Sequence, residues 1–502
     1  MHAEKIVNPP TDLIYDLAVI GGGINGAGIA CDAAGRGLSV FLCEMHDLAA
    51  HTSSASSKLI HGGLRYLEHY EFRLVREALA EREVLLAKAP HIVRPMHFIL
   101  PHRPHLRPAW MIRAGLFMYD HLGKRKKLPA SRGLRFGPDS PLKAEISRGF
   151  EYADCWVDDA RLVVLNALAA LEHGARIATR TRCLSAKRHA NHWQLQLQHA
   201  DGRLETLLAR TLVNASGPWV ASFIKDGLEQ KPPYGIRLIQ GSHLIVPRLH
   251  DGAQAYILQN DDRRIVFVIP YLDRFSMIGT TDCEYHGDPG KVEITDSEID
   301  YLLEVVNAHF RQQLERQDIL QTFSGVRPLC DDESDDPSAV TRDYTLALSG
   351  NKGEAPLLSV FGGKLTTYRK LAEAAIEQLE PWLPDMAGNW TEHATLPGGE
   401  KMDSPDQLVR SLTRDQPWIP VTLAQRWSQS YGSRSWQILE GVQALEQLGE
   451  HFGDDLYQRE VDYLCQVEWA QTAEDILWRR SKLGLFLDAK QQARLQDYLT
   501  SN

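Results

Sequence analysis

Residues 15–26 read YDLAVIGGGING, a short apolar run that passes directly into a turn rich in glycine. The run predicts a buried strand, and residues 24–36 are typical of a helix that begins in this turn. Gly21 permits the tight bend, Gly23 lets the backbone approach a pyrophosphate, and Gly26 lets helix and strand pack closely. Because the amide groups at a helix N-terminus attract anions, the stretch predicts a phosphate-binding βα unit.

An acidic residue follows this turn at a matching distance. Residues 38–43 predict a second strand, which ends on Glu44. A carboxylate at that position can accept hydrogen bonds from both hydroxyl groups of an adenosine ribose. A glycine triplet alone also occurs in α/β turns that bind nothing. The combination of the first strand, the glycine triplet, the helix, the second strand and Glu44 predicts a dinucleotide site.

The bulk composition is that of a soluble globular enzyme. The chain has 502 residues, enough for two or three domains, and 43% of them are hydrophobic. Its formal net charge of -10 argues against a protein that binds nucleic acid. The sequence contains no apolar window of about 18 residues that could span a bilayer. Residues 1–14 lack the apolar core of a secretory signal, and we expect them to form a mobile extension.

The seven cysteines are an odd number, lie far apart and form no Cys-x-x-Cys pair. This pattern predicts reduced thiols in a cytoplasmic protein, without a disulfide framework. It also predicts no metal site.

The order of strands and helices predicts three domains. The dinucleotide-binding domain, a doubly wound and Rossmann-like α/β fold, is assigned to residues 15–90, 150–230 and 340–385. Residues 233–285 contain short strands at hairpin spacing, so we expect an antiparallel β-sheet in a second domain formed by 91–149 and 231–339. A helix start at Ser404-Pro405 and later helical runs predict an all-helical domain at 386–502.

Three more segments place small and hydroxyl-bearing residues where a cofactor would lie. Residues 52–66 read TSSASSKLIHGGLRY, which offers many donors and ends in a pattern that a plain serine-rich loop would not need. Residues 214–219 read NASGPW and come just beyond a predicted strand, where a dinucleotide crosses a sheet. Residues 361–368 read FGGKLTTY, and a helix start there would hold negative charge with its free amides.

These segments, together with SGVRPL at 324–329 and TRDY at 341–344, closely resemble the aerobic, FAD-dependent glycerol-3-phosphate dehydrogenases of bacteria. The resemblance runs from about residue 13 to the end of the chain. It implies the fold of the D-amino-acid-oxidase-like flavoproteins, with an FAD-binding domain, an antiparallel substrate-binding domain and a helical C-terminal cap. It also implies oxidation of sn-glycerol 3-phosphate to dihydroxyacetone phosphate, with electrons passed to ubiquinone at a membrane.

The motifs and the resemblance together predict that FAD is bound non-covalently, and they predict the residues that contact it. The residues expected to contact it are Gly21, Gly23, Asn25, Gly26, Glu44, Thr52, Ser53, Ser57, His61, Gly62, Ala215, Gly217, Gly363, Lys364, Leu365 and Thr366. Of these, Gly363 and Lys364 are expected to stabilise the anionic edge of the reduced flavin.

A phosphorylated substrate needs fixed cations, because guanidinium and ammonium groups donate charge-assisted hydrogen bonds to phosphate oxygens. Such cations occur in the motifs above as Arg65, Arg327, Arg342 and Lys364, with Tyr66 as a neutral donor. The resemblance places Arg65, Arg327 and Lys364 at the substrate. Arg342 belongs either there or to a surface ion pair with a nearby acid.

Oxidation of a secondary alcohol moves a hydride from C2 to flavin N5 while the hydroxyl proton leaves, and a histidine suits that proton transfer. His243 in the antiparallel domain is the first candidate and His61 the second. A lone histidine on a strand is usually structural, so this role of His243 depends on the resemblance. Arg327 and Lys364 complete the predicted catalytic group.

A basic segment lies at 102–127. Its cations, which accompany a single acid, Asp120, are Arg103, Arg107, Arg113, Lys124, Arg125, Lys126 and Lys127. Apolar and aromatic residues lie between them, which favours peripheral attachment to an anionic surface, here the inner face of the cytoplasmic membrane. The alternative is a solvated basic face with ordinary core residues between the charges.

Two rival functions remain open. A flavin oxidase of the same superfamily would pass electrons to oxygen and oxidise glycerol 3-phosphate, another alcohol or an amine, although an amine oxidase would not need these cations. A nucleotide-binding membrane interaction module without turnover would leave the motifs at 61–66 and 362–367 without a purpose. A homodimer is also open, because no motif reports on oligomeric state.

Overall fold

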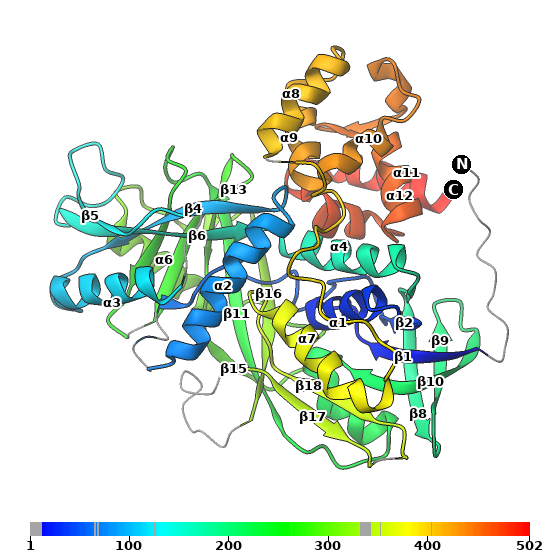
Figure 1. Cartoon of the computed structure of the whole chain (residues 1–502). Helices are drawn as coiled ribbons and strands as arrows, with labels where there is room; N and C mark the ends of the chain where they lie inside the picture. The colour runs from blue at the N-terminus through cyan, green and yellow to red at the C-terminus, as the bar shows by residue number, and fades with distance from the viewer. Residues whose placement is uncertain are drawn as a thin grey trace.

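The computed structural model describes residues 13–64, 67, 70–123, 127–262, 264–331, 343–351, 353–402 and 404–501. In this part of the chain an eight-stranded sheet, a ten-stranded sheet and a helical C-terminal unit pack together (Figure 1). The predicted fold class, a doubly wound α/β domain with an antiparallel domain and a helical C-terminal domain, is confirmed. Nearly all of the predicted N-terminal extension lies outside the described residues.

The eight-stranded sheet has a parallel centre built from strands that are far apart in sequence. Its order is β17-β18-β10-β1-β2-β7, in which all neighbours except β17 and β18 run parallel. The strands are β1 (Ile14–Ile20), β2 (Val40–Cys43), β7 (Arg176–Ala178), β10 (Leu204–Asn214), β17 (Thr345–Ser349) and β18 (Leu357–Phe361), with β9 (Trp193–His199) beside β10 and β8 (Thr181–Arg188) beside β9. Because parallel strands end at one edge, Gly21, Glu44, Ala215 and Gly362 come together there.

Both faces of this sheet are buried, which explains why β1 is an almost continuous apolar run. Leu17 and Val19 belong to a core cluster that includes α1 (Ile24–Gly35), α4 (Asp159–Glu172) and α7 (Tyr368–Leu379). Ala18 and Ile20 point the other way, into a cluster that includes β8 and β9. The helices on the first face begin near the edge where the strands end.

The ten-stranded sheet is antiparallel except for the β4–β12 pair. Its order is β15-β11-β14-β13-β12-β4-β6-β3, with β16 beside β11 and β5 beside β6. The strands are β3 (Leu59–Ile60), β4 (Val93–Pro101), β5 (Arg132–Arg135), β6 (Arg148–Val157), β11 (Ile236–Pro247), β12 (Ala255–Gln259), β13 (Ile265–Tyr271), β14 (Phe275–Gly279), β15 (Cys283–Tyr285) and β16 (Gln321–Cys330). α6 (Asp296–His309) covers one face, and α2 (Phe72–Lys88) and α3 (Ala109–Leu122) cover the other.

Two segments assigned to the dinucleotide-binding domain belong to this second sheet instead. β6 pairs with β4 along its whole length, from Val93 opposite Val157 to Pro101 opposite Gly149. β3 pairs with β6 in turn. The apolar residues between 91 and 150 recur with no clear helix or strand period. The strand that pairs with β6 could therefore not be recognised from the sequence.

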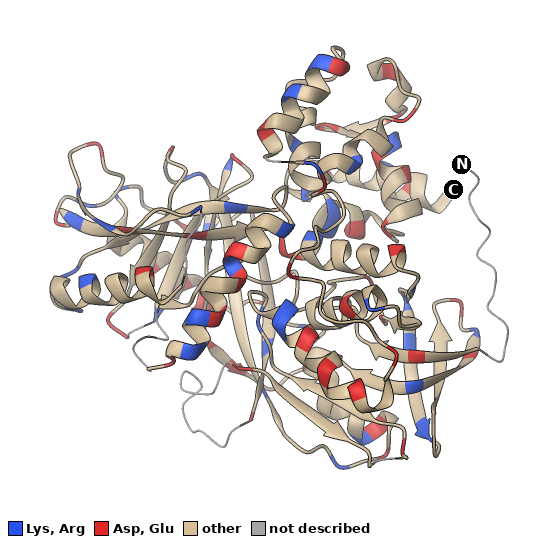
Figure 2. Ribbon diagram, in the orientation of Figure 1, with Lys and Arg blue, Asp and Glu red and all other residues tan. Residues whose placement is uncertain are grey.

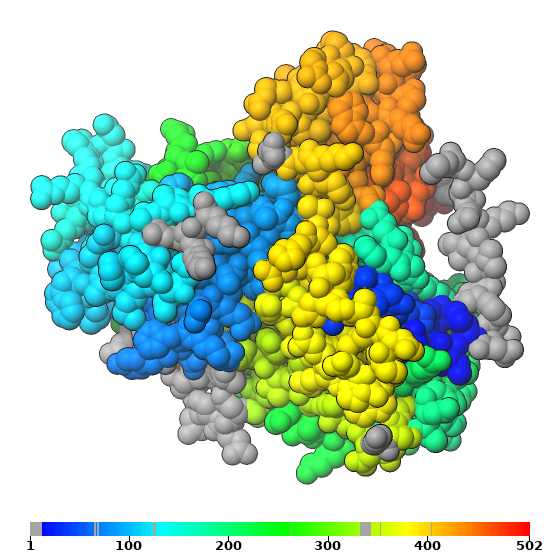
Figure 3. All heavy atoms as spheres, in the orientation of Figure 1, coloured from blue at the N-terminus to red at the C-terminus, as the bar shows by residue number. Residues whose placement is uncertain are grey.

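The C-terminal unit has its own core and sits above α4 in Figure 1. Its helices are α8 (Pro405–Asp415), α9 (Val421–Ser430), α10 (Ser435–Ile438), α11 (Gln458–Val467), α12 (Ala489–Ser501) and the π-helix η8 (Asp475–Arg480). It is not entirely helical as predicted, because β19 (His451–Gly453) and β20 (Leu456–Tyr457) pair. The yellow segment in Figure 3 runs over the surface from α7 to this unit.

The structure also bears on the cysteines and on membrane-spanning helices. All seven cysteines lie in the described part of the chain as free thiols. Within the same residues, no helix has the length and apolarity needed to cross a membrane.

Candidate active site

Two cavities open at the edge where the parallel strands end. One of about 210 Å³ extends from the glycine turn past Glu44 to Trp219. The other, of about 490 Å³, continues from the same turn to the ten-stranded sheet. Gly23, Ser53 and Ala215 line both, so the cavities form two parts of one site that bridges the domains.

The glycine turn has the geometry that its sequence predicts. Gly21 has a φ of 111°, which a side chain would strain. A Cβ atom at Gly26 would lie 1.9 Å from the Gly21 carbonyl oxygen, so α1 can pack on β1 only because this atom is missing. At Gly23 a Cβ atom would lie 3.1 Å from Ser53 Oγ and would otherwise enter the cavity. The space beside Gly23 is therefore available for a ligand.

Glu44 lies directly after β2 and lines the smaller cavity. Its two carboxylate oxygens accept hydrogen bonds from the backbone amides of Gly22, at 2.7 Å, and His46, at 2.8 Å. Burial raises the pKa of Glu44, whereas these two amide hydrogen bonds lower it. The backbone thus fixes the carboxylate at the position expected to hold an adenosine ribose.

Asn25 shows that the turn is built to receive a polar group. Its side-chain nitrogen donates to the Gly362 carbonyl at 3.0 Å, which connects α1 to the turn after β18. Its Oδ1 atom is buried and has no hydrogen-bond partner among the described residues. Buried acceptors in proteins normally find a donor. An unused acceptor, the open space at Gly23 and the Glu44 carboxylate together fit a bound dinucleotide.

His243 lies on β11 at the wall of the larger cavity. Its Nε2 atom is 2.9 Å from Ser57 Oγ, and its ring stacks on Phe323 at 4.6 Å between centroids. Burial, and then the charges of Lys58 and Arg327, lower the pKa of His243 to about 3. The imidazole is therefore neutral near pH 7 and can accept a hydrogen bond or a proton.

Among the described residues, four cations line the same cavity, Arg107, Arg264, Arg327 and Lys364, and the last two are predicted substrate contacts. Arg327 on β16 donates from Nη1 to Asp282 at 2.7 Å and from Nη2 to the Thr281 carbonyl at 3.0 Å. Lys364 lies in the turn after β18. Since His243 lines this cavity too, the arrangement places a neutral acceptor around one space with the charges of Arg327 and Lys364.

Most predicted cofactor residues line the cavities, and two do not. Those at the walls are Gly21, Gly23, Asn25, Glu44, Thr52, Ser53, Ser57, His61, Ala215, Gly217, Gly363, Lys364, Leu365 and Thr366. Gly26 packs against Gly21 instead. Gly62 faces α3, where its amide donates to the Tyr119 hydroxyl at 2.8 Å. Arg65, Tyr66 and Arg342, three predicted substrate contacts, lie outside the described residues.

The turn around Gly363 differs from the prediction. α7 begins at Tyr368, and residues 365–367 form a separate turn, so Gly362 and Gly363 do not lie at a helix start. Their φ values of 78° and 110° explain the difference, because these left-handed conformations end β18 before the helix begins. Any stabilisation of negative charge there comes from the turn and Lys364, not from a helix N-terminus.

Three charged residues at or next to the site were not singled out from the sequence, and of these Asp282 lines the larger cavity. Asp282 fixes Arg327, and Asp159 holds Lys58 at 2.8 Å in a buried ion pair. Lys58 lies 5.3 Å from the centre of the Phe323 ring, on which His243 stacks. Lys58 lies within the 52–66 motif, so the sequence did indicate that it is near the site. Asp159 and Asp282 carry no such signal, because their partners are distant in sequence.

The chain matches two family models. Residues 16–369 match the family described as FAD dependent oxidoreductase, which covers most of the chain and both cavities. The chain belongs to this family. Residues 389–498 match a second model, described as the C-terminal domain of alpha-glycerophosphate oxidase. FAD is therefore the dinucleotide that the glycine turn, Glu44 and the Asn25 acceptor fit.

Relatives of known name cover nearly the whole chain. The glycerol-3-phosphate dehydrogenase of Pseudomonas aeruginosa is 71% identical over 100% of this chain and 98% of its own length. The aerobic glycerol-3-phosphate dehydrogenase of Escherichia coli is 60% identical over 96% and 97%. The D-erythritol 1-phosphate dehydrogenase of Brucella abortus is 52% identical over the same shares.

A solved structure shares the architecture. The glycerol-3-phosphate dehydrogenase from Bacillus halodurans, complexed with FAD, superposes with a TM-score of 0.75 at 25% identity. The match covers 98% of this chain and 95% of the other. The two-sheet fold with its C-terminal unit is thus that of a known flavoprotein.

Proposed function

We propose that this protein oxidises sn-glycerol 3-phosphate to dihydroxyacetone phosphate with FAD as the hydride acceptor. The observation that carries the proposal is the larger cavity, where Arg327, Lys364 and His243 line one space next to the cofactor turn. The names of the relatives that are 71% and 60% identical support this substrate. Bleaching of the bound flavin under anaerobic conditions on addition of glycerol 3-phosphate tests it, and a flavin that stays oxidised contradicts it.

The residues of the cavity divide the chemistry between them. When bound, FAD supplies the acceptor for the hydride that leaves C2. Arg327 and Lys364 bind the phosphate, since both carry a fixed positive charge. His243 takes the C2 hydroxyl proton at Nε2, the nitrogen that contacts Ser57. A bound phosphate dianion offsets the charge of Arg327, so we expect it to raise the pKa of His243 in the complex.

Removal of one cation should weaken the enzyme for phosphorylated substrates alone. In Arg327→Ala or Lys364→Ala one charge-assisted contact is lost, which costs about 1.5–3 kcal/mol. At about 1.4 kcal/mol per tenfold, kcat/KM for glycerol 3-phosphate should fall roughly 10- to 100-fold. The efficiency with glycerol, which has no phosphate, should fall far less.

A matched control lies in the 3-10 helix η4 (Arg316–Asp318), which follows α6 in the chain. Arg316 pairs with Asp296 and Asp300 on the surface, away from both cavities, and Arg316→Ala should leave kcat/KM unchanged. An equal loss for glycerol and glycerol 3-phosphate in the Arg327 or Lys364 variants would mean that these cations hold the flavin or the fold.

The relative named D-erythritol 1-phosphate dehydrogenase suggests a second candidate substrate. Both compounds are polyol phosphates, so the same cations and the same histidine would serve. A ratio of kcat/KM values above one for glycerol 3-phosphate over D-erythritol 1-phosphate supports the first assignment, and the inverse ratio supports the second.

We further propose that the electrons pass to ubiquinone and that α3 attaches the protein to the membrane. The outer face of α3 carries Trp110, Met111, Phe117 and Met118, which are 72%, 45%, 57% and 40% exposed. Figure 2 draws most of this helix in tan, and Figure 1 shows it at the left edge of the molecule, apart from the C-terminal unit. Lys124, Arg125 and Lys126 of the predicted basic segment lie outside the described residues.

The variant Trp110→Asn/Phe117→Asn tests this surface. Insertion of the two rings removes apolar area from water at about 25 cal/mol per Å², so partition onto anionic vesicles should weaken roughly 10- to 100-fold. Reduction of a soluble dye should persist, and reduction of quinone in the vesicles should drop. Leu204, which is 59% exposed on β10, supplies the control Leu204→Asn. Unchanged sedimentation of the double variant with vesicles would contradict the proposal.

The acceptor needs its own measurement, because an oxidase would share every residue named above. Oxygen consumption without added quinone should stay far below the rate of quinone reduction. Oxygen consumption at the full turnover rate would instead identify a glycerol-3-phosphate oxidase.

A further inference from the structure

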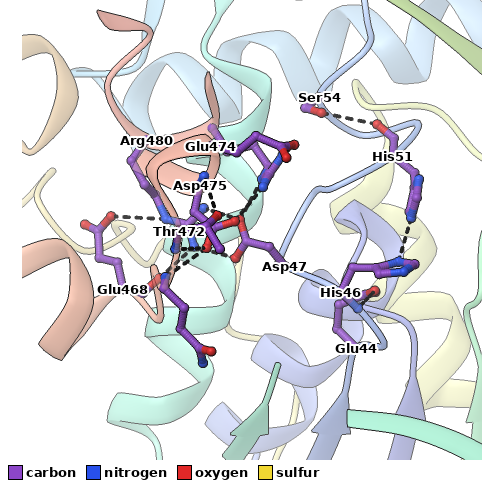
Figure 4. Close-up of polar contacts among 12 residues, drawn as sticks. Glu44, His46, Asp47, His51, Ser54, Glu468, Thr472, Glu474, Asp475 and Arg480 are labelled. Atoms are coloured by element: carbon purple, nitrogen blue, oxygen red, sulfur yellow. Dashed lines mark hydrogen bonds and ion pairs between the residues drawn. The ribbon is translucent and has the colours of Figure 1, made fainter. Parts of the chain in front are cut away.

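The loop after Glu44 carries a buried acid that contacts the C-terminal unit and not the cavity. Asp47 is 2% exposed. Its carboxylate accepts hydrogen bonds from Arg479 Nε at 2.7 Å and from both terminal nitrogens of Arg480 at 2.8 Å. Both arginines come from η8, near the end of the chain. Figure 4 shows Arg480 and Asp47 side by side. An aspartate at the edge of the first sheet is thus held by the C-terminal unit.

This contact belongs to a longer network of buried charges. Arg480 also donates to the Glu468 carbonyl at 2.7 Å. The Glu468 carboxylate accepts two hydrogen bonds from Arg161 of α4. Arg161, Glu468 and Arg480 are fully buried, and removal of Glu468 would leave Arg161 without its carboxylate partner in the interior. The network therefore ties the C-terminal unit to α4 as well as to the loop.

The segment that Asp47 holds forms the wall of the smaller cavity. Glu44 precedes Asp47 in it, and residues 49–53 follow and line the same space. His46 donates its amide to Glu44, and its ring nitrogen Nδ1 is 2.9 Å from Nε2 of His51. His51 packs edge-on against Trp219 at 4.7 Å. A shift of Asp47 would therefore move the groups that surround the adenosine half of a bound FAD.

A second contact ties the other side of the segment to the same helix. The backbone amide of Arg180 donates to the His46 carbonyl at 2.8 Å, and that of Thr181 donates to the Glu44 carbonyl at 2.7 Å. The Arg180 guanidinium donates to Asp475 at 2.5 Å, and Asp475 also pairs with Arg479. η8 thus reaches the segment both directly through Asp47 and indirectly through Arg180.

We propose that Asp47 and Arg480 are positioning residues for FAD: by docking on Asp47, the C-terminal unit sets the orientation of Glu44 and the loop that follows it. The cofactor affinity of the first domain then depends on a domain that contributes no residue to either cavity among those described. The proposal rests on the FAD dependence of the family and not on which alcohol the enzyme oxidises.

The test measures the dissociation constant of FAD by dilution and ultrafiltration of the holoenzyme. Asp47→Asn keeps the shape of the side chain and removes its charge, so FAD should bind roughly 10- to 100-fold more weakly. If Asp47 acts through Glu44, the same substitution should have little further effect in a Glu44→Gln background. The full fold-change in that background would overturn the proposal, because Asp47 would then act independently of Glu44.

A control separates positioning from stability. Glu460 is a buried acid inside the C-terminal unit, where it accepts hydrogen bonds from Arg426, Trp427 and Tyr431. Glu460→Gln should lower the thermal midpoint of the holoenzyme without changing the affinity for FAD. If Asp47→Asn gives the same result, a lower midpoint with unchanged FAD affinity, the contact is a structural interface only and the proposal fails.

A milder pair of variants covers the case in which Asp47→Asn does not fold. Arg480→Lys keeps the charge but loses the two-pronged contact, and should weaken FAD binding by a smaller factor. Asp47→Leu/Arg480→Met removes both charges together and avoids an unpaired charge. Both are expected to lose FAD more readily than wild type, and wild-type affinity in both would overturn the proposal.

Discussion

Replacement of Gly23 by valine is expected to give a folded protein that purifies without flavin. Gly23 has a φ of −81° and a ψ of −177°, an extended conformation that valine adopts without strain. The new side chain would occupy the space that the pyrophosphate needs, since Gly23 lines both cavities. The flavin absorbance of the purified variant should be absent, and turnover with it, while the far-ultraviolet circular dichroism should match that of wild type.

Two other glycines supply the comparison. At Gly26 a Cβ atom would lie 1.9 Å from the Gly21 carbonyl oxygen, so Gly26→Val should lose folded structure as well as flavin. At Gly133 a Cβ atom would meet open space, and Gly133→Ala should keep both. Full FAD occupancy in Gly23→Val would show that the pyrophosphate lies elsewhere.

His243→Ala is expected to slow flavin reduction by roughly 100- to 10,000-fold, the range for loss of a group that transfers a proton. FAD should stay bound, because His243 lies on β11 in the second sheet and not in the glycine turn. Stopped-flow measurement of flavin reduction by glycerol 3-phosphate, without oxygen, gives the rate directly. Reduction at the wild-type rate would move the role to His61.

The pKa of His243 sets the pH range of this experiment. Burial and the neighbouring cations lower that pKa to about 3 in the substrate-free protein. The imidazole is therefore neutral throughout the range near pH 7, and its protonation reduces activity only as the pH falls toward the pKa. Ser57→Ala, which removes the contact to Nε2, should give a smaller loss than His243→Ala.

The glycine turn after β1 could be predicted from the sequence because its determinants are local. Gly21, Gly23 and Gly26 lie at the junction of β1 and α1, and Glu44 follows directly after the adjacent strand β2. The spacing of these residues is set by β1, α1 and β2 alone. Parallel strands then bring Ala215 and Gly362 to the same edge, which the apolar runs before them also indicate.

The surroundings of His243 could not be predicted in the same way. Ser57 contacts His243 across 186 residues of sequence, and Phe323 stacks on it from a neighbouring strand. Gly62 turns toward Tyr119 of α3, in a part of the chain whose pattern predicts no element. The contact between Asp47 and Arg480 spans 433 residues. Such contacts depend on how the two sheets and the C-terminal unit pack, which no local pattern reports.

The pairing of β10 with β18 has a consequence for how the protein is made. Leu212 lies opposite Leu357. The central strand β10 of the eight-stranded sheet therefore pairs with a strand that is synthesised much later. The turn at Gly363 and the Arg480 contact follow later still. During synthesis the early βα unit is thus exposed without its full set of neighbours, and closing such long loops is slow. We therefore expect FAD to be taken up after the chain leaves the ribosome, so that the cofactor stabilises a nearly finished molecule instead of guiding its first folding steps.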